Sequence, residues 1–144
     1  MLLNLSTFLV PFFFIVGALA QASVIQLPTP GARIRNGQTF TVQIAKPMSH
    51  QGSREAGFVI GLLPCTSGSC PGPAVEVGRL LYNGPYTPQL HEQPGRPYQN
   101  FTFTMPPADE MPKGFAQLST IRLHLFGAAA YPILELNNIT IRVI

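Results

Sequence analysis

Alternation between apolar and polar residues is the strongest pattern in this chain, and it predicts β-strands. Every second side chain is apolar in residues 38–45, and the same alternation returns in 98–105 and 137–143. A period of two is typical of half-buried antiparallel strands. The side chains expected to point inward are Phe40, Val42, Ile44, Phe101, Phe103, Met105, Ile139, Ile141 and Val143.

Three further segments have strand character without such regular alternation. Residues 56–63 are apolar on both sides and short, which favours a central strand. Residues 75–82 follow a run of prolines and are expected to return antiparallel to 56–63. A short strand is expected near Val24 to Leu27.

The segment 117–126 also alternates, and its polar members bear on where a functional site could lie. Ile121 and Leu123 share one side with Leu125, opposite Arg122 and His124. We therefore expect the three aliphatic residues to point into the core, with the two polar residues on the outer surface.

Proline and glycine limit the fold classes that are compatible with these strands. The chain has 15 prolines and 13 glycines among 144 residues, spread along its length, and they leave no long helical pattern uninterrupted. About seven short strands in about 120 residues match an immunoglobulin-like or fibronectin-III-like antiparallel β-sandwich. A small β-barrel is the alternative.

The N-terminal residues are expected to direct secretion rather than to fold. Residues 8–19 are apolar, and small residues follow them, with A-x-A patterns that end at Ala20 and at Ala22. We interpret residues 1–22 as a signal peptide and 23–144 as a single domain, with cleavage after either alanine. A membrane anchor is the alternative, but Pro11 interrupts the run and no basic residue flanks it.

Secretion would give the two cysteines and two Asn-x-Thr sequences a role. Cys65 and Cys70 are the only cysteines, and in an oxidising compartment they should form a disulfide that fixes a tight loop. A redox or metal role is the alternative, although no second pair completes a site. Asn100 and Asn138 begin N-glycosylation sequons and lie on the polar sides of their predicted strands.

Charge and chemistry-bearing residues are sparse. Charged residues make up 10% of the chain, the formal net charge is +3, and no basic cluster is present, which argues against nucleic-acid binding. Asp109 beside Glu110 and His91 beside Glu92 could act as acid–base groups, but solvated loops are the simpler interpretation. No nucleophile or metal motif appears, so we expect neither an enzyme nor a cofactor.

One loop offers residue types that suit protein binding. Between Tyr82 and Tyr98 the chain presents Tyr86 and Arg96 among prolines. Tyrosine and arginine are enriched at the energetic centres of protein interfaces. We therefore consider Tyr82, Tyr86, Arg96 and Tyr98 as partner-binding candidates, with ordinary turn packing as the alternative.

Three blocks of sequence resemble the fungal necrosis-inducing secreted protein (Nis1-like) effector family. The first joins FTVQ at 40–43 to GFVIGL at 57–62 and the two cysteines, the second runs from VGRLLYNGPY at 77–86 to PYQNFTFTMP at 97–106, and the third runs from GFAQL at 114–118 to LELNNIT at 134–140. The resemblance implies a secreted, non-enzymatic effector that suppresses pattern-triggered immunity in plants by binding and inhibiting immune receptor-associated kinases. Some members provoke host cell death.

The resemblance also implies where the protein would act: in the host apoplast or inside host cells. We expect a monomer without a membrane anchor in its mature form. Two other hypotheses compete: a structural or cell-wall-associated, sugar-binding sandwich, and an unrecognised hydrolase. Only the hydrolase requires convergent polar groups in a cleft.

Overall fold

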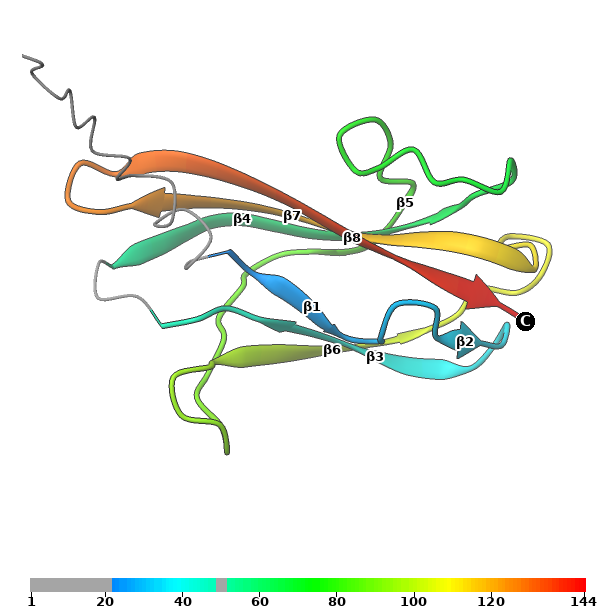
Figure 1. The fold of residues 1–144 in the computed structure, drawn as a ribbon, viewed down its shortest axis with the longest axis horizontal. Coiled ribbons are helices and arrows are strands. Elements are labelled where there is room, and N and C mark those ends of the chain that lie inside the picture. The colour runs from blue at the N-terminus through cyan, green and yellow to red at the C-terminus, as the bar shows by residue number, and fades with distance from the viewer. Residues whose placement is uncertain (1–21, 49–51) are drawn as a thin grey trace, which may run out of the picture.

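The computed structural model describes residues 22–48 and 52–144, and their regular structure consists of β-strands (Figure 1). The expected signal peptide therefore lies outside the described residues, apart from Ala22. In chain order the strands are β1 (Val24–Leu27), β2 (Arg33–Ile34), β3 (Thr39–Ala45), β4 (Ser53–Pro64), β5 (Arg79–Asn83), β6 (Tyr98–Thr104), β7 (Gly114–Phe126) and β8 (Tyr131–Val143).

The strands form two sheets that pack face to face (Figure 1). One sheet has three strands in the order β1-β3-β6, and the other has five in the order β2-β8-β7-β4-β5. Their pairs are antiparallel except for β2 with β8. The expectation of an all-β sandwich is confirmed, and β4 is a central strand as its apolar composition predicts. The two-residue β2 is an addition that no pattern in the sequence indicated.

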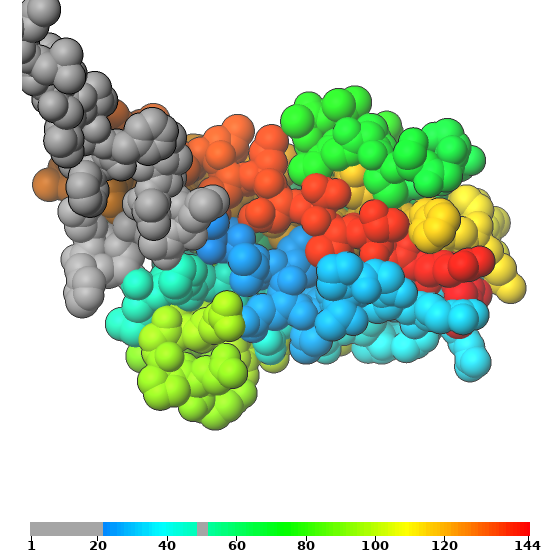
Figure 2. All heavy atoms as spheres, in the orientation of Figure 1, coloured from blue at the N-terminus to red at the C-terminus, as the bar shows by residue number. Residues whose placement is uncertain are grey.

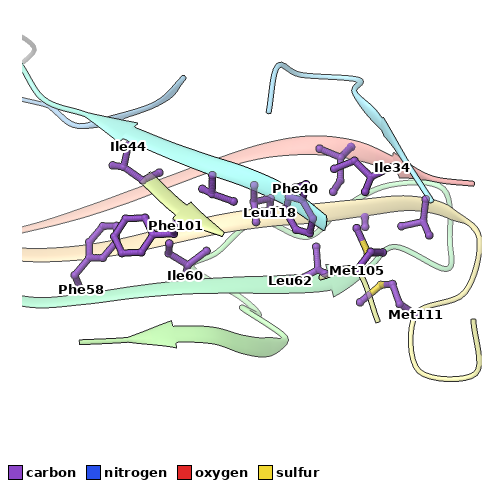
Figure 3. Close-up of a cluster of buried hydrophobic side chains, with 14 of the residues drawn as sticks. Ile34, Phe40, Ile44, Phe58, Ile60, Leu62, Phe101, Met105, Met111 and Leu118 are labelled. Atoms are coloured by element: carbon purple, nitrogen blue, oxygen red, sulfur yellow. The ribbon is translucent and has the colours of Figure 1, made fainter. Parts of the chain in front are cut away.

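The core lies between the sheets and is built by the alternation that the sequence shows (Figure 3). Val42 and Ile44 from β3 have no exposed surface, and they face Ile60 and Leu62 from β4, which are equally buried. Phe101 on β6 pairs directly with Val42 and is 6% exposed. Most of the predicted inward residues are buried; Phe103 and Ile139 are only partly buried and pack at the margin of the core.

The faces of β7 are the reverse of the expectation. Arg122 and His124 point between the sheets and are each 1% exposed, whereas Leu123 lies on the outer face and is 37% exposed. The reason is continuity: β7 pairs with β8 without a bulge from Gly114 to Phe126, so Leu118 and Arg122 must share a face. The interior of the sandwich therefore changes from apolar to charged along a single strand.

A disulfide-bonded loop, residues 65–78, covers the outer face of the five-stranded sheet near the end of β4 (bright green in Figure 1). The predicted bond between Cys65 and Cys70 is present. Gln117 fastens the loop, because its Oε1 accepts from the Gly72 amide at 2.7 Å and its Nε2 donates to the Glu76 carbonyl at 2.9 Å. This contact explains why Gln117 is buried although it lies on the outer face.

Strand β5 begins later than the sequence suggested. Residues 75–78 belong to the loop, and the strand starts only after Gly78, whose φ is +78°. A Cβ atom at this position would lie 2.8 Å from the Leu63 Cβ, so the close approach also requires glycine. The antiparallel return along β4 is confirmed for the shorter strand.

Candidate functional site: a tyrosine-bearing loop above a buried charge cluster

The loop between β5 and β6 projects from the sandwich as a separate lobe (yellow-green in Figure 2). Its backbone is fixed where it leaves and rejoins the fold. Gln89 and Tyr98 exchange two backbone hydrogen bonds of 3.1 and 3.0 Å, and the Met48 amide donates to the Gly95 carbonyl at 3.1 Å. The Thr87 amide donates to the Gln99 side chain at 2.8 Å. Although it is rich in proline, the loop is therefore a folded element.

Tyr86 occupies the core and is unavailable for partner contact in this structure. It is 2% exposed, its ring stacks on Phe58 at 4.5 Å, and its hydroxyl donates to the Ile44 carbonyl at 3.2 Å. Burial raises the pKa of the Tyr86 hydroxyl, which therefore remains a donor. The interpretation of Tyr86 as a binding residue is wrong, because its ring completes the sandwich core.

Tyr82 is half-buried near the end of β5, just before the loop begins. Its ring lies 4.7 Å from that of Phe101, and its hydroxyl donates to the Pro85 carbonyl at 2.6 Å. Gly84 allows this turn, because a Cβ there would lie 2.8 Å from the Tyr82 hydroxyl oxygen. Tyr82 mainly shapes the loop and offers little free surface.

Arg96 and Tyr98 lie where the loop rejoins the fold, and Tyr98, the first residue of β6, is partly buried. The Tyr98 ring stacks on His91 with centroids 3.8 Å apart, and its hydroxyl donates to the Glu92 carboxylate at 3.3 Å. Arg96 is exposed, and Leu90 is 56% exposed. We call these five residues the loop tip: Leu90, His91, Glu92, Arg96 and Tyr98.

A hollow of ≈ 400 Å³ separates the base of this loop from β4. Its walls come from the start of β4 and the turn after β5, so it lies beside the buried Tyr86. The residues that line it are Glu55, Ala56, Gly57, Phe58, Asn83, Gly84, Pro85, Tyr86 and Thr87.

Beneath the loop, a cluster of paired charges fills one end of the interior. The Arg122 guanidinium donates to Glu55 through Nε and Nη2 at 2.8 and 2.6 Å, and to Glu135 through Nη1 at 2.9 Å. Lys46 also binds Glu55 at 2.9 Å. The Arg122 Cζ lies 5.7 Å from the centre of the Tyr86 ring, so the cluster supports the base of the loop.

Ser23, just before β1, completes this cluster from the other sheet. Its amide and hydroxyl both donate to Glu135 Oε2, at 3.1 and 2.7 Å. Asn137 Nδ2 donates in turn to the Ser23 carbonyl at 3.1 Å. Ser23 has no exposed surface, so this contact fastens the N-terminal end of the described fold to β8.

His124 lies against the cluster. Neither ring nitrogen has a hydrogen-bond partner among the described residues, and Nε2 is 3.5 Å from Glu135 Oε1. Burial lowers the pKa of His124, and the nearby Arg122 lowers it further. Burial of Glu55 opposes its ionisation, but the hydrogen bonds from Arg122 and Lys46 outweigh that effect and hold the pKa of Glu55 below its usual value.

The charge cluster was missed because Arg122 and His124 were placed on the outer surface. The sequence did contain a signal. The apolar positions of β7 change from even-numbered residues, such as Leu118, to odd-numbered residues, such as Ile121. A strand without a bulge keeps its even-numbered residues on one face throughout, so both sets cannot face the core. Such a conflict indicates that one of the two sets of apolar residues does not face the core. The cluster is a paired structural network, since each carboxylate already binds a cation.

The remaining candidates occupy exposed positions. His91 and Glu92 both contact Tyr98, and Glu110 pairs with Arg79. Asn100 and Asn138, the sequon asparagines, are exposed on the outer faces of β6 and β8.

Comparison with known proteins bears on the identity of this fold. Over the part of the chain that the structure describes, no helix has the length and apolarity needed to span a membrane. Among curated proteins, none matches the sequence. The Nis1 family matches over residues 20–142, which include both cysteines, the loop tip and the charge cluster. The chain therefore belongs to the Nis1 family.

Proposed function

We propose that this protein is a secreted fungal effector that suppresses pattern-triggered immunity in plants. It does so by binding immune receptor-associated kinases and inhibiting them stoichiometrically, without turning over a substrate. Membership of the Nis1 family over nearly the whole predicted mature chain carries the proposal. The type of partner, a plant immune receptor-associated kinase, is the one that the resemblance to this effector family implies.

The loop tip is the contact surface that the geometry supports best. Arg96 and Tyr98 are residue types enriched at the energetic centres of interfaces. The hydrogen bonds at Gln89 and Gly95 hold the loop before a partner arrives, which reduces the conformational entropy lost on binding. Tyr86 contributes from below, by anchoring the base of the loop in the core.

Binding to the kinase domain of a plant immune co-receptor tests this proposal. The protein is produced in a secreting eukaryotic host, and its affinity is measured by titration calorimetry beside that of the H91A/R96A variant. We expect the double variant to bind at least about tenfold more weakly, as is usual when interface anchors are truncated. The Arg54→Ala variant is the control, since Arg54 is an exposed arginine on β4 that lies outside the loop tip.

The outcomes separate the contact surface from the function. If H91A/R96A binds as tightly as the parent, the loop tip is not the contact surface. If the parent binds no such kinase, the effector function fails for this protein. A glycan array in parallel examines the sugar-binding alternative. Because Asn100 shares a strand face with Tyr98, the parent is also compared with Asn100→Gln, which removes a glycan beside the loop.

A further inference from the structure

The outer face of the five-stranded sheet is apolar near the β7–β8 hairpin. Leu123 pairs directly with Leu134, and Ile121 with Leu136, so these four side chains form two adjacent rows. Leu123 is 37% exposed, Leu134 is 60% exposed and Leu136 is 39% exposed. We call the whole surface the apolar face; its residues are Val59, Ile121, Leu123, Leu125, Leu134 and Leu136.

Among the described residues, the disulfide loop covers part of this side of the sheet but ends before it reaches the apolar face. The loop buries Gln117 and Ser119 on the same side of β7, whereas Leu123, four residues beyond Ser119, is exposed. Contiguous exposed apolar residues on a soluble protein usually mark a surface that something else covers.

The position of β8 in the sheet increases the tendency of this apolar surface to associate with another molecule. Among the described strands, only β2 pairs with its other side, and it does so over the two residues Arg142 and Val143. A long edge strand that carries exposed leucines is a template for edge-to-edge association. Pro132 removes one backbone donor, but Leu134 and Leu136 lie beyond it.

Asn138 stands at the border of the apolar face. It pairs with Ser119, is exposed, and lies on the outer face two residues from Leu136. Its sequon, completed by Thr140, would place an N-linked glycan next to the surface that the disulfide loop covers. The glycan would extend from the same surface that the leucines occupy.

We propose that an N-linked glycan on Asn138 covers the apolar face and keeps the secreted protein monomeric. The proposal rests on the proposed secretion, because only the secretory pathway attaches this glycan. Sugar rings present C–H groups on their faces and hydroxyl groups around their rims. A glycan can therefore lie on the leucines and still present a hydrated surface to solvent.

The second sequon provides a matched control within the same chain. Asn100 lies on the outer face of β6, where it pairs with Gln43 and accepts a hydrogen bond from the Gln43 amide at 3.0 Å. Its neighbours on that face include Tyr98, Thr102 and Thr41, of which the two threonines pair with each other. A glycan at Asn100 covers polar surface, so its loss should leave association unchanged.

The test compares the parent, Asn138→Gln and Asn100→Gln, all secreted from a eukaryotic host. Intact mass gives the occupancy of each sequon, light scattering after gel filtration gives the solution mass, and the fluorescence of an apolar dye reports accessible apolar surface. We expect Asn138→Gln to at least double in solution mass and to bind more dye, while Asn100→Gln matches the parent. Adding Leu134→Thr and Leu136→Thr to Asn138→Gln should restore the monomer.

Enzymatic removal of the glycan from the folded parent serves as a second measurement if Asn138→Gln fails to fold. Association after removal, and its absence when Leu134 and Leu136 are threonine, supports the proposal. An unoccupied Asn138 in the secreted parent, or a deglycosylated protein that stays monomeric with unchanged dye binding, overturns it. None of these readouts involves a host protein, so a failure here is distinguishable from a failure to bind kinases.

Discussion

At the scale of single residues, Arg122 carries the largest share of the buried polar contacts. It is 1% exposed and binds Glu55 and Glu135, whose side chains are 17% and 12% exposed. Arg122→Ala would leave two largely buried carboxylates without their main cation. We expect a loss of about 3–5 kcal/mol in the free energy of unfolding, measured by urea denaturation.

The control for this prediction is Arg54→Ala, which removes an exposed arginine from β4. Its free energy of unfolding should stay within about 0.5 kcal/mol of the parent value. Equal urea midpoints for Arg122→Ala and the parent would mean that the cluster does not stabilise the fold.

His124 predicts how stability depends on pH. Because burial lowers the pKa of His124 in the folded state, the unfolded chain binds a proton first as the pH falls. The contribution of His124 to the free energy of unfolding is fully present above the pKa of the unfolded chain, about 6.5. It is lost as the pH falls from there through the pKa of the folded state. The charged groups around the ring are Lys46, Glu55, Arg122 and Glu135.

Glu55 produces a second loss of stability, at lower pH. Its lowered pKa contributes stability above the unfolded value of about 4.3, and this is lost as the pH falls through the folded pKa. Unfolding titrations between about pH 7.5 and pH 5 should therefore show the His124 effect alone. That decline should disappear in His124→Leu and persist in His91→Gln, where an exposed ring is replaced. A decline that survives in His124→Leu would assign it to another group.

At the scale of elements, β6 provides a comparison of two phenylalanines on one face. Phe101 is 6% exposed and contacts the rings of Phe58 and Tyr82, whereas Phe103 lies at the margin of the core. We expect Phe101→Ala to cost about 3–5 kcal/mol and Phe103→Ala to cost less. Thermal unfolding of both variants checks the order, and the reverse order would contradict the core described here.

The disulfide loop should matter locally more than globally. The bond joins residues five apart and closes a small ring. Replacing Cys65 and Cys70 by serine should therefore cost only about 2 kcal/mol. The double variant should remain folded, because Gln117 still holds the loop through Gly72 and Glu76. Circular dichroism and the melting temperature check this, and global unfolding would show that the loop is essential to the sheet.

These elements also show how far the sequence can be interpreted. Regular alternation located β3 and β6 and their buried sides correctly, because each strand has one face on the core and one in water. The same rule failed for β7, where the disulfide loop covers one face and a charge cluster lies beneath the other. Tyr86 was likewise misplaced, because local sequence cannot show that a loop residue returns to the core.

At the scale of the whole molecule, the two ends of the sandwich differ in what covers the sheet. The disulfide loop covers one end, and the apolar face remains open at the other. Composition and strand rhythm were enough to predict a β-sandwich, and a single pair of cysteines in a chain expected to be secreted was enough to predict its disulfide. The charge cluster unites Ser23, Lys46, Glu55, Arg122 and Glu135, and pairing over such distances in the chain leaves no local sequence pattern.

The central claim is that this protein inhibits a host kinase by binding it, without consuming a substrate. Titrating the purified protein into a fixed concentration of the co-receptor kinase domain, with phosphate transfer as the readout, tests it most directly. We predict that kinase activity falls linearly to a plateau at one equivalent when the kinase concentration exceeds the dissociation constant. Full kinase activity at a large excess of the protein, or inhibition by a small fraction of an equivalent that grows with time, would contradict it.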